Sequence, residues 1–272
     1  MPRYTEIGPL PEKMIGGVRV WDIRECKHVV IPDGVEKIED HWFWNSGIES
    51  VEIPASVREI GAEVFCYCRN LKTVLFQEES SLNRIGANCF FGSGLEKIIV
   101  PSSVAVIGDF AFSNCRLLKH VSFQENGNLK VIGDNCFRDS WIEEITIPNS
   151  VTAIGSKAFR GCWYLGIVKF LEESALRKLS SDCFLGAGIE QIVIPRSVVS
   201  IERNAFYWCN RLKEISFEEG SRLEKVGDGC FFGSGIEEFL APPSLLTIGD
   251  NAFSECRSLT RVVLNKGFQG FV

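Results

Sequence analysis

The sequence contains no long apolar run and no cluster of basic residues. No segment approaches the roughly 18–20 consecutive apolar residues that a membrane-spanning helix needs, so we expect no membrane insertion. Lysine and arginine number 29 against 35 aspartates and glutamates, which gives a formal net charge of −6. Nucleic acids are bound through a basic stripe that displaces counterions, and the interleaved charges of this chain offer none. We therefore expect no nucleic acid partner.

Residues typical of catalytic sites are also scarce. The three histidines are His28, His41 and His120, and none lies near a serine or cysteine together with a carboxylate in a pattern that suggests a triad. A phosphate loop of the form G-x-x-x-x-G-K-S/T is missing, and no Cys-x-x-Cys pair suggests a zinc site. The sequence predicts a protein that is not an enzyme and that needs no cofactor or metal.

The N-terminal segment Met1–Glu6 lacks the apolar core of a secretory signal. This observation leaves two interpretations open. Either the protein stays in the cytoplasm, or the sequence is a trimmed piece of a longer polypeptide.

Two residue types recur at fixed intervals. A proline recurs every 47 residues, at Pro54, Pro101, Pro148, Pro195 and Pro242. A phenylalanine recurs in steps that alternate between 22 and 25 residues, at Phe43, Phe65, Phe90, Phe112, Phe137, Phe159, Phe184, Phe206, Phe231 and Phe253. A period in this range predicts a solenoid, in which each unit buries its apolar face against its neighbours. Such a chain offers a long surface more readily than an enclosed pocket.

Each unit contains an L-x-x-L-x-L segment, as at residues 118–123 and 142–147. The alternation of apolar and polar residues over its last four positions is typical of a half-buried strand. One strand per unit, always entered from the same side, predicts a single parallel sheet along one face. An Ile-Gly step is expected to turn the chain, and the following Ala/Cys-Phe segment to form one helical or 3-10 turn. The predicted fold class is a strand-rich α/β repeat solenoid.

Nine of the eleven cysteines occupy register positions of the repeat. One column precedes every second anchor phenylalanine and the other follows the remaining anchors by three residues; their members are Cys89, Cys136, Cys183 and Cys230, and Cys68, Cys115, Cys162, Cys209 and Cys256. Members of one column lie about 10 Å apart if strands stack at roughly 4.8 Å. A disulfide requires Cα atoms within roughly 7 Å, so we expect buried, reduced thiols.

Three regions are predicted along the chain. Residues 1–25 lie outside the repeat and are expected to form an N-terminal cap. Residues 26–264 form the solenoid of ten Phe-anchored units. Residues 265–272 form a tail too short to cover a strand edge, and an open parallel edge invites pairing. We therefore expect either that the native polypeptide extends further or that this end associates with another copy of the chain.

The repeated motif is I-P-x-S-V-x-x-I-G-x-x-A-F-x-x-C-x-x-L-x-x-V-x-F, which residues 147–170 match closely. It resembles the BspA-like class of leucine-rich repeats, and the resemblance covers about 235 residues, from Val29 to Leu264. It implies a leucine-rich-repeat horseshoe or gently curved solenoid. Members of this class are largely surface antigens of bacteria and parasitic protists, and some bind extracellular-matrix proteins or mediate adhesion. The resemblance implies a cell-surface location but carries over no functional residue, because the shared positions are core positions.

The open face of the predicted sheet is the first candidate binding surface. Side chains at the second and third variable positions of each segment point away from the core. The candidate partner-binding residues on this face are Leu75, Lys97, Ile99, His120, Glu144, Lys169, Gln191, Val193, Glu214 and Leu240. Exposed aliphatic residues suggest a binding strip, although β-branched residues also favour strands for their own sake.

Aromatic residues near the turns form a second candidate surface. They are Trp44, Phe91 and Phe232, which follow anchor residues, and Trp163, Tyr164, Tyr207 and Trp208, which crowd two neighbouring turns. Tyrosine and tryptophan are enriched at interfaces. The alternative, which we favour, is that they cover the turn ends of the core.

These observations predict a non-enzymatic protein-binding module of the surface or adhesion type. Its partner is expected to be an extracellular-matrix or cell-surface protein, or another copy bound through the C-terminal edge. The alternative is an intracellular scaffold that uses the same solenoid to hold a cellular partner.

Overall fold

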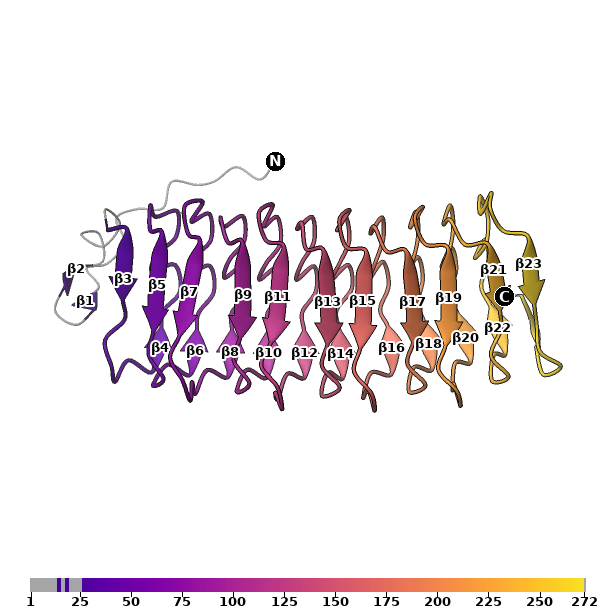
Figure 1. The fold of residues 1–272 in the computed structure, drawn as a ribbon, viewed down its shortest axis with the longest axis horizontal. Coiled ribbons are helices and arrows are strands. Elements are labelled where there is room, and N and C mark those ends of the chain that lie inside the picture. The colour runs from indigo at the N-terminus through magenta and orange to yellow at the C-terminus, as the bar shows by residue number, and fades with distance from the viewer. Residues whose placement is uncertain (1–13, 16–17, 20–25, 272) are drawn as a thin grey trace.

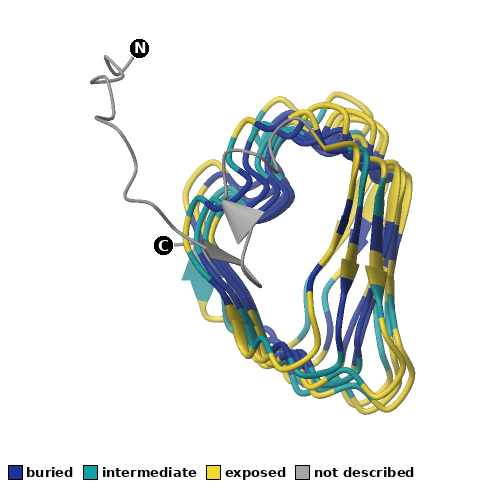
Figure 2. Ribbon diagram, turned by 90° about the vertical axis from the view of Figure 1, so that its left-hand side faces the viewer, coloured by how far each residue is buried: buried dark blue, intermediate teal, exposed yellow. Residues whose placement is uncertain are grey.

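Each Phe-anchored unit forms one coil of a parallel β-solenoid (Figure 1). A computed structural model of the protein describes residues 14–15, 18–19 and 26–271. In these residues the chain contains strands and turns but no helix, and so no helix that could cross a membrane. Two walls of strands run along the solenoid, with the apolar side chains packed between them (Figure 2).

The first wall consists of the long strands, one per coil. They are β3 (His28–Val30), β5 (Ser50–Ile53), β7 (Thr73–Phe76), β9 (Lys97–Val100), β11 (His120–Phe123), β13 (Glu144–Ile147), β15 (Ile167–Phe170), β17 (Gln191–Ile194), β19 (Glu214–Phe217), β21 (Glu238–Leu240) and β23 (Arg261–Val263). Their second residue is buried in every strand from β3 to β21, and the residues on either side of it point outward. The alternation predicted from the sequence is confirmed.

The second wall consists of two-residue strands. They are β4 (Lys37–Ile38), β6 (Glu59–Ile60), β8 (Arg84–Ile85), β10 (Val106–Ile107), β12 (Val131–Ile132), β14 (Ala153–Ile154), β16 (Lys178–Leu179), β18 (Ser200–Ile201), β20 (Lys225–Val226), β22 (Thr247–Ile248) and β24 (Gly270–Phe271). The prediction of one sheet was therefore incomplete. The residues that lead into each expected Ile-Gly turn pair in parallel with their counterparts in the next coil, because the turn repeats in register.

Glycine at this step lets successive coils approach closely. A Cβ atom on Gly86 would overlap the carbonyl group of Gly61 in the preceding coil. No side chain can be accommodated there without moving the backbone. The glycine is therefore required by the contact between coils rather than only by the turn.

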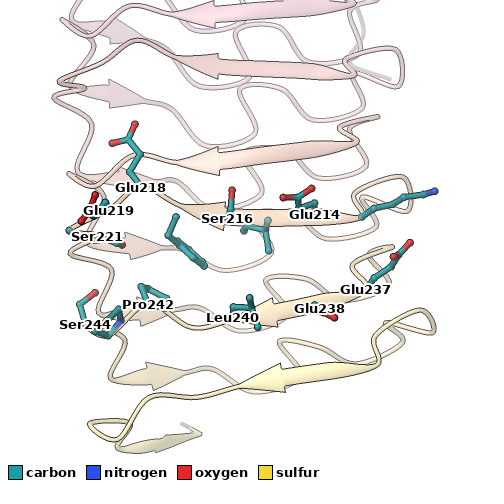
Figure 3. Close-up of a pocket in the computed structure, with 15 residues that line it drawn as sticks. Glu214, Ser216, Glu218, Glu219, Ser221, Glu237, Glu238, Leu240, Pro242 and Ser244 are labelled. Atoms are coloured by element: carbon teal, nitrogen blue, oxygen red, sulfur yellow. The ribbon is translucent and has the colours of Figure 1, made fainter.

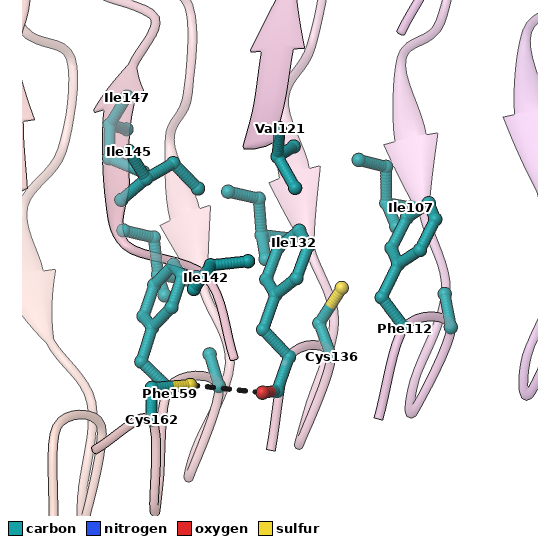
Figure 4. Close-up of a cluster of buried hydrophobic side chains, with 14 of the residues drawn as sticks. Ile107, Phe112, Val121, Ile132, Cys136, Ile142, Ile145, Ile147, Phe159 and Cys162 are labelled. Carbon is teal, nitrogen blue, oxygen red and sulfur yellow. Dashed lines mark hydrogen bonds between the residues drawn. The ribbon is translucent and has the colours of Figure 1, made fainter. Parts of the chain in front are cut away.

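The anchor phenylalanines form one continuous column through the core (Figure 4). Every consecutive pair from Phe43 to Phe253 is stacked, with ring centroids 5.1–5.5 Å apart and interplanar angles of 4–12°. The first nine anchors are completely buried, and Phe253 is partly buried. The predicted stack of mutually sealing coils is confirmed.

The segments around the anchors are turns of a different kind from those expected. We call them the Phe turns: each begins two residues before an anchor and ends three residues after it, so that the first is 41–46 and the last 251–256. We predicted a helical or 3-10 turn, but both the residue two before and the residue two after every anchor have positive φ. Left-handed residues at that spacing interrupt a right-handed helix.

Hydrogen bonding explains why these left-handed residues are tolerated. In the turn around Phe159, the N–H groups of Lys157, Phe159 and Gly161 donate to carbonyls of the next coil at 2.8–3.1 Å, whereas those of Arg160 and Cys162 donate back within their own turn. Alternate N–H groups therefore link adjacent coils. The Phe turns form a third ladder along the solenoid, although they are not β-strands.

The cysteines are buried thiols, as predicted. No disulfide joins any pair among the described residues, and all but the exposed Cys26 and the partly buried Cys256 are buried. The column that follows the anchors does more than fill space, because each of its thiols donates a hydrogen bond to an anchor carbonyl of the preceding coil. Cys162 Sγ lies 3.0 Å from the carbonyl oxygen of Phe137, the contact drawn in Figure 4.

The solenoid is an elongated rod and not the expected horseshoe (Figure 1). A leucine-rich-repeat horseshoe curves when its outer wall holds helices, which are about 10 Å across, opposite strands spaced about 4.8 Å apart. Here both walls consist of strands and have the same spacing, so neither wall forces a bend. The same reason makes the α/β part of the predicted fold class wrong for the described residues.

The two ends of the chain differ from the predicted regions in what can be said of them. Most of the predicted cap, residues 1–25, lies outside the described residues; within it, β1 (Met14–Ile15) and β2 (Val18–Arg19) pair antiparallel. The segment 265–272 was expected to be too short to cover a strand edge. It supplies β24, which pairs with β22 and extends the short-strand wall by one rung.

Candidate functional site

The outward face of the long strands carries all ten residues singled out from the sequence. We call this surface the sheet face and define it as the first and third residues of each long strand. The structure places every candidate there as an exposed side chain: Leu75, Lys97, Ile99, His120, Glu144, Lys169, Gln191, Val193, Glu214 and Leu240. Their exposure follows from strand alternation, and their role in binding stays a prediction.

The strand register brings some of these residues together and separates others. Lys97 pairs with His120, and His120 with Glu144, so these three side chains follow one another along the first column of the face. Gln191 and Glu214 are partners in the same column farther along. The remaining candidates belong to the third column and are spread over the length of the rod. The ten residues therefore form a strip and not a compact site.

Apolar side chains stand out of this face to an unusual extent. Leu75, Ile99, Val193 and Leu240 are 50–58% exposed. Ile167, which was not among the candidates, is 45% exposed in the first column and pairs with Gln191. Exposed apolar residues that follow one another along a surface are a feature of partner-binding sites.

A charged ladder lies at the entrance to the long strands and was missed in the sequence. The residue just before each strand alternates between lysine and glutamate, with one glycine as the exception, at Lys27, Glu49, Lys72, Glu96, Lys119, Glu143, Gly166, Glu190, Lys213 and Glu237. Lys27 Nζ lies 2.9 Å from Glu49 Oε1, and Lys119 Nζ lies 3.1 Å from Glu143 Oε1. The hydrogen bond and charge of Lys27 lower the pKa of Glu49. This edge therefore carries both signs of charge.

The aromatic candidates divide into two groups. Trp44, Phe91, Tyr207 and Phe232 are partly buried, in agreement with the interpretation that they cover the turn ends of the core. A second group, made up of Trp163, Tyr164 and Trp208, is 50–62% exposed and contradicts it. Trp208 has a positive φ, and its ring lies over Gly233 of the next coil.

A groove opens in the sheet face near its C-terminal end, between β19 and β21 (Figure 3). It has a volume of about 1240 Å³ and is lined by both strands and by the loops that leave them. Ile215, Phe217, Leu240 and Pro242 provide its apolar part. Sequence patterns did not reveal the groove, because it depends on how two neighbouring coils separate.

Few groups with catalytic chemistry come together in the described residues. His28 Nδ1 lies 2.7 Å from Ser50 Oγ at an exposed position, and the next two residues along this column are Thr73 and Lys97, so the pair is not a repeated feature. No group of three or more His, Cys, Asp or Glu residues in the described part of the chain is placed to hold a metal ion. The arrangement offers a surface for contact rather than a reaction centre.

Comparison with known proteins agrees with the repeat architecture. The model of the BspA type leucine rich repeat region matches residues 36–166 and 177–271, in six copies. The chain belongs to this family. Leucine-rich repeats of this kind are generally non-catalytic. No curated protein is significantly similar to the sequence of this BspA-type chain.

Two solved structures share the fold of the BspA-type chain. The pneumococcal vaccine antigen PcpA is 25% identical, with a TM-score of 0.65 over 91% of this chain and 68% of PcpA. A leucine-rich repeat protein from Bacteroides ovatus is 23% identical, with a TM-score of 0.60 over 91% of this chain and 75% of its own. The first of these proteins is described as an antigen, and the second comparison concerns the fold alone.

Proposed function

We propose that this BspA-type chain is a protein-binding module displayed at the cell surface, and that it binds its partner protein through the sheet face. The observation that supports the proposal most directly is the exposure of Leu75, Ile99, Val193 and Leu240 on a single wall. Family membership and the likeness to a vaccine antigen support the surface location. The partner expected from this class is an extracellular-matrix or cell-surface protein.

The opposite wall provides the control for a binding test. The sheet face and the short-strand wall belong to the same coils, so substitutions on the two walls can be compared within one fold. Lys169 on β15 and Lys178 on β16 are both exposed lysines, and they lie on opposite walls. The same change of charge can therefore be made on either side of the rod.

The first test is capture of the partner from host or neighbouring-cell surface proteins. We expect Ile99→Asp and Lys169→Glu to reduce capture at least about fivefold, because each places a new negative charge on the proposed contact surface. Lys178→Glu makes the same change of charge on the short-strand wall and should leave capture unchanged. Thermal unfolding of the three variants checks that each remains folded. Equal capture by all three variants would move the site away from the sheet face.

A second test addresses display. Intact cells that carry the protein are treated with a biotin reagent that reacts with amines and does not cross membranes. Surface display predicts strong labelling of exposed lysines such as Lys97 and Lys169. Labelling that appears only after lysis would contradict display and favour the intracellular scaffold.

A further inference from the structure

The long strands are joined in pairs rather than evenly. From the first residue of β5, Ser50, to that of β7, Thr73, is 23 residues, and all four residues of these strands are in register. From Thr73 to the first residue of β9, Lys97, is 24 residues, and β7 and β9 are not paired. The alternation continues along the rod, so that β9–β11, β13–β15, β17–β19 and β21–β23 form pairs separated by wider junctions (Figure 1).

The groove occupies the junction between β19 and β21, which belong to separate sheets. Phe239, the buried residue of β21, is larger than the isoleucine at the equivalent position of β17, Ile192. Its ring centroid lies 5.9 Å from that of Phe217 and 5.0 Å from that of Phe253. The groove therefore lies over a packed aromatic core, which holds its two sides in place.

The groove has acidic ends and an apolar middle. Glu214, Glu237 and Glu238 lie at the end where the strands begin, and Glu218 and Glu219 lie at the end where β19 stops, with Leu240 between them (Figure 3). Five glutamates therefore face a single lysine, Lys213, in the lining.

Several of these carboxylates are available to a ligand. Glu238 is already 3.7 Å from Arg261, and Glu218 accepts a hydrogen bond from the backbone N–H of Arg196. Within the described part of the chain, no ion pair is formed by Glu214, Glu219 or Glu237. An incoming cation can therefore reach both ends of the groove.

The spacing of the two ends restricts what fits. Glu214 begins β19 and Glu218 follows its last residue, so the two are four residues apart on extended chain, which corresponds to about 13 Å at roughly 3.3 Å per residue. In an extended peptide, residues i, i+2 and i+4 point to the same side. Cations at i and i+4 with an apolar residue at i+2 therefore match the acidic ends and the apolar middle.

We propose that the groove between β19 and β21 binds an extended segment of a partner protein with lysine or arginine at i and i+4 and an apolar residue at i+2. The proposal rests on the proposed protein-binding function and assigns one part of the sheet face to one class of ligand. Charge complementarity selects the ends of the segment, and burial of the central side chain against Leu240 and Phe217 adds affinity.

An equivalent junction in the same rod supplies the control. Between β11 and β13, the residues His120, Gln124 and Thr146 stand where Glu214, Glu218 and Leu240 stand at the groove, two repeats of 47 residues earlier. Glu143 and Glu144 are the equivalents of Glu237 and Glu238, so this pair of carboxylates is common to both junctions. The β11/β13 junction therefore has less negative charge and no apolar centre.

The test uses the labelled peptide acetyl-Lys-Ser-Leu-Ser-Lys-amide and fluorescence anisotropy at low ionic strength. We expect Glu214→Gln with Glu237→Gln to weaken binding about tenfold, since exposed charge pairs contribute modestly and two are removed. Glu143→Gln with Glu144→Gln removes the same charge from the control junction and should change binding less than about twofold. Peptides with glutamate for lysine, or serine for leucine, should bind at least about fivefold more weakly. Thermal unfolding confirms that the variants are folded.

Other outcomes would overturn the proposal. They are no binding of the lysine peptide, equal loss from both pairs of substitutions, or equal binding of the control peptides. The groove and the proposed function can fail separately. Partner capture that depends on Ile99 and Lys169 while the lysine peptide fails to bind defeats only the groove, whereas peptide binding without capture defeats only the broader proposal.

Discussion

The Phe turns and the sheet face belong to the same coils but differ in how strictly their residues repeat. Around each anchor, side chain, burial and backbone conformation recur from coil to coil, as Phe137 and Phe159 illustrate. On the sheet face, equivalent positions change between apolar and basic residues, as in Ile99, Lys169 and Leu240. The difference teaches that packing fixes the residues of one surface and leaves those of the other free to vary with the ligand.

The largest expected effect is a loss of stability at alkaline pH, caused by the buried thiols of the Phe turns. Burial raises the pKa of Cys162 and Cys209 to about 12 and that of Cys115 to about 11. Unfolded thiols ionise near about pH 8.5. Their contribution to stability is therefore complete below that pH and falls above it, by about 1.4 kcal/mol per pH unit for each thiol that stays protonated only in the folded state.

Urea unfolding at pH 7, 9 and 10, with the thiols kept reduced, measures this effect. The variant Cys162→Ala with Cys209→Ala removes two of the thiols and should show a shallower decline. Stability that is constant from pH 8 to pH 10 would contradict the assigned burial.

The next largest effect concerns the aromatic column. Phe159→Ala should reduce the free energy of unfolding by about 3–5 kcal/mol, because it leaves a cavity between two stacked rings. Ile99→Ala on the sheet face should change it by less than about 0.5 kcal/mol. Chemical denaturation of both variants makes the comparison. Similar losses at the two sites would show that the sheet face also contributes to the core.

The smallest effect tests the backbone of the Phe turns. Lys157 has a φ of 60°. Lys157→Gly should stabilise the chain by up to about 1 kcal/mol, because glycine adopts this conformation without strain, and Lys157→Val should destabilise it by a similar amount. Thermal unfolding measures both changes. The opposite order would mean that contacts of the lysine side chain outweigh backbone strain.

Much of the fold could be predicted because the repeat exposes its own packing rule. The spacing of Phe137 and Phe159 predicted the stacked column, and the placement of Cys162 predicted a buried thiol. The helical turns and the horseshoe were wrong for a common reason. Local composition does not show that alternate N–H groups bind the next coil, and a second strand wall follows from that close approach between coils.

The candidate site was predictable only in part. Strand alternation was enough to place Ile99 and Val193 on the surface. The groove could not be found in the same way, because it depends on a one-residue difference between successive strand spacings. The charged ladder was visible in the sequence at Lys119 and Glu143, one position before the variable positions considered.

The pairing of long strands has a consequence for how such a chain can change in length. A coil that ends in a narrow junction must be followed by one that begins a wide junction. Removal of a single coil would bring two junctions of the same kind together and shift the register of every later strand. Gene duplication or deletion is therefore expected to proceed in steps of 47 residues, the interval between successive prolines, and each step that lengthens the rod adds another wide junction.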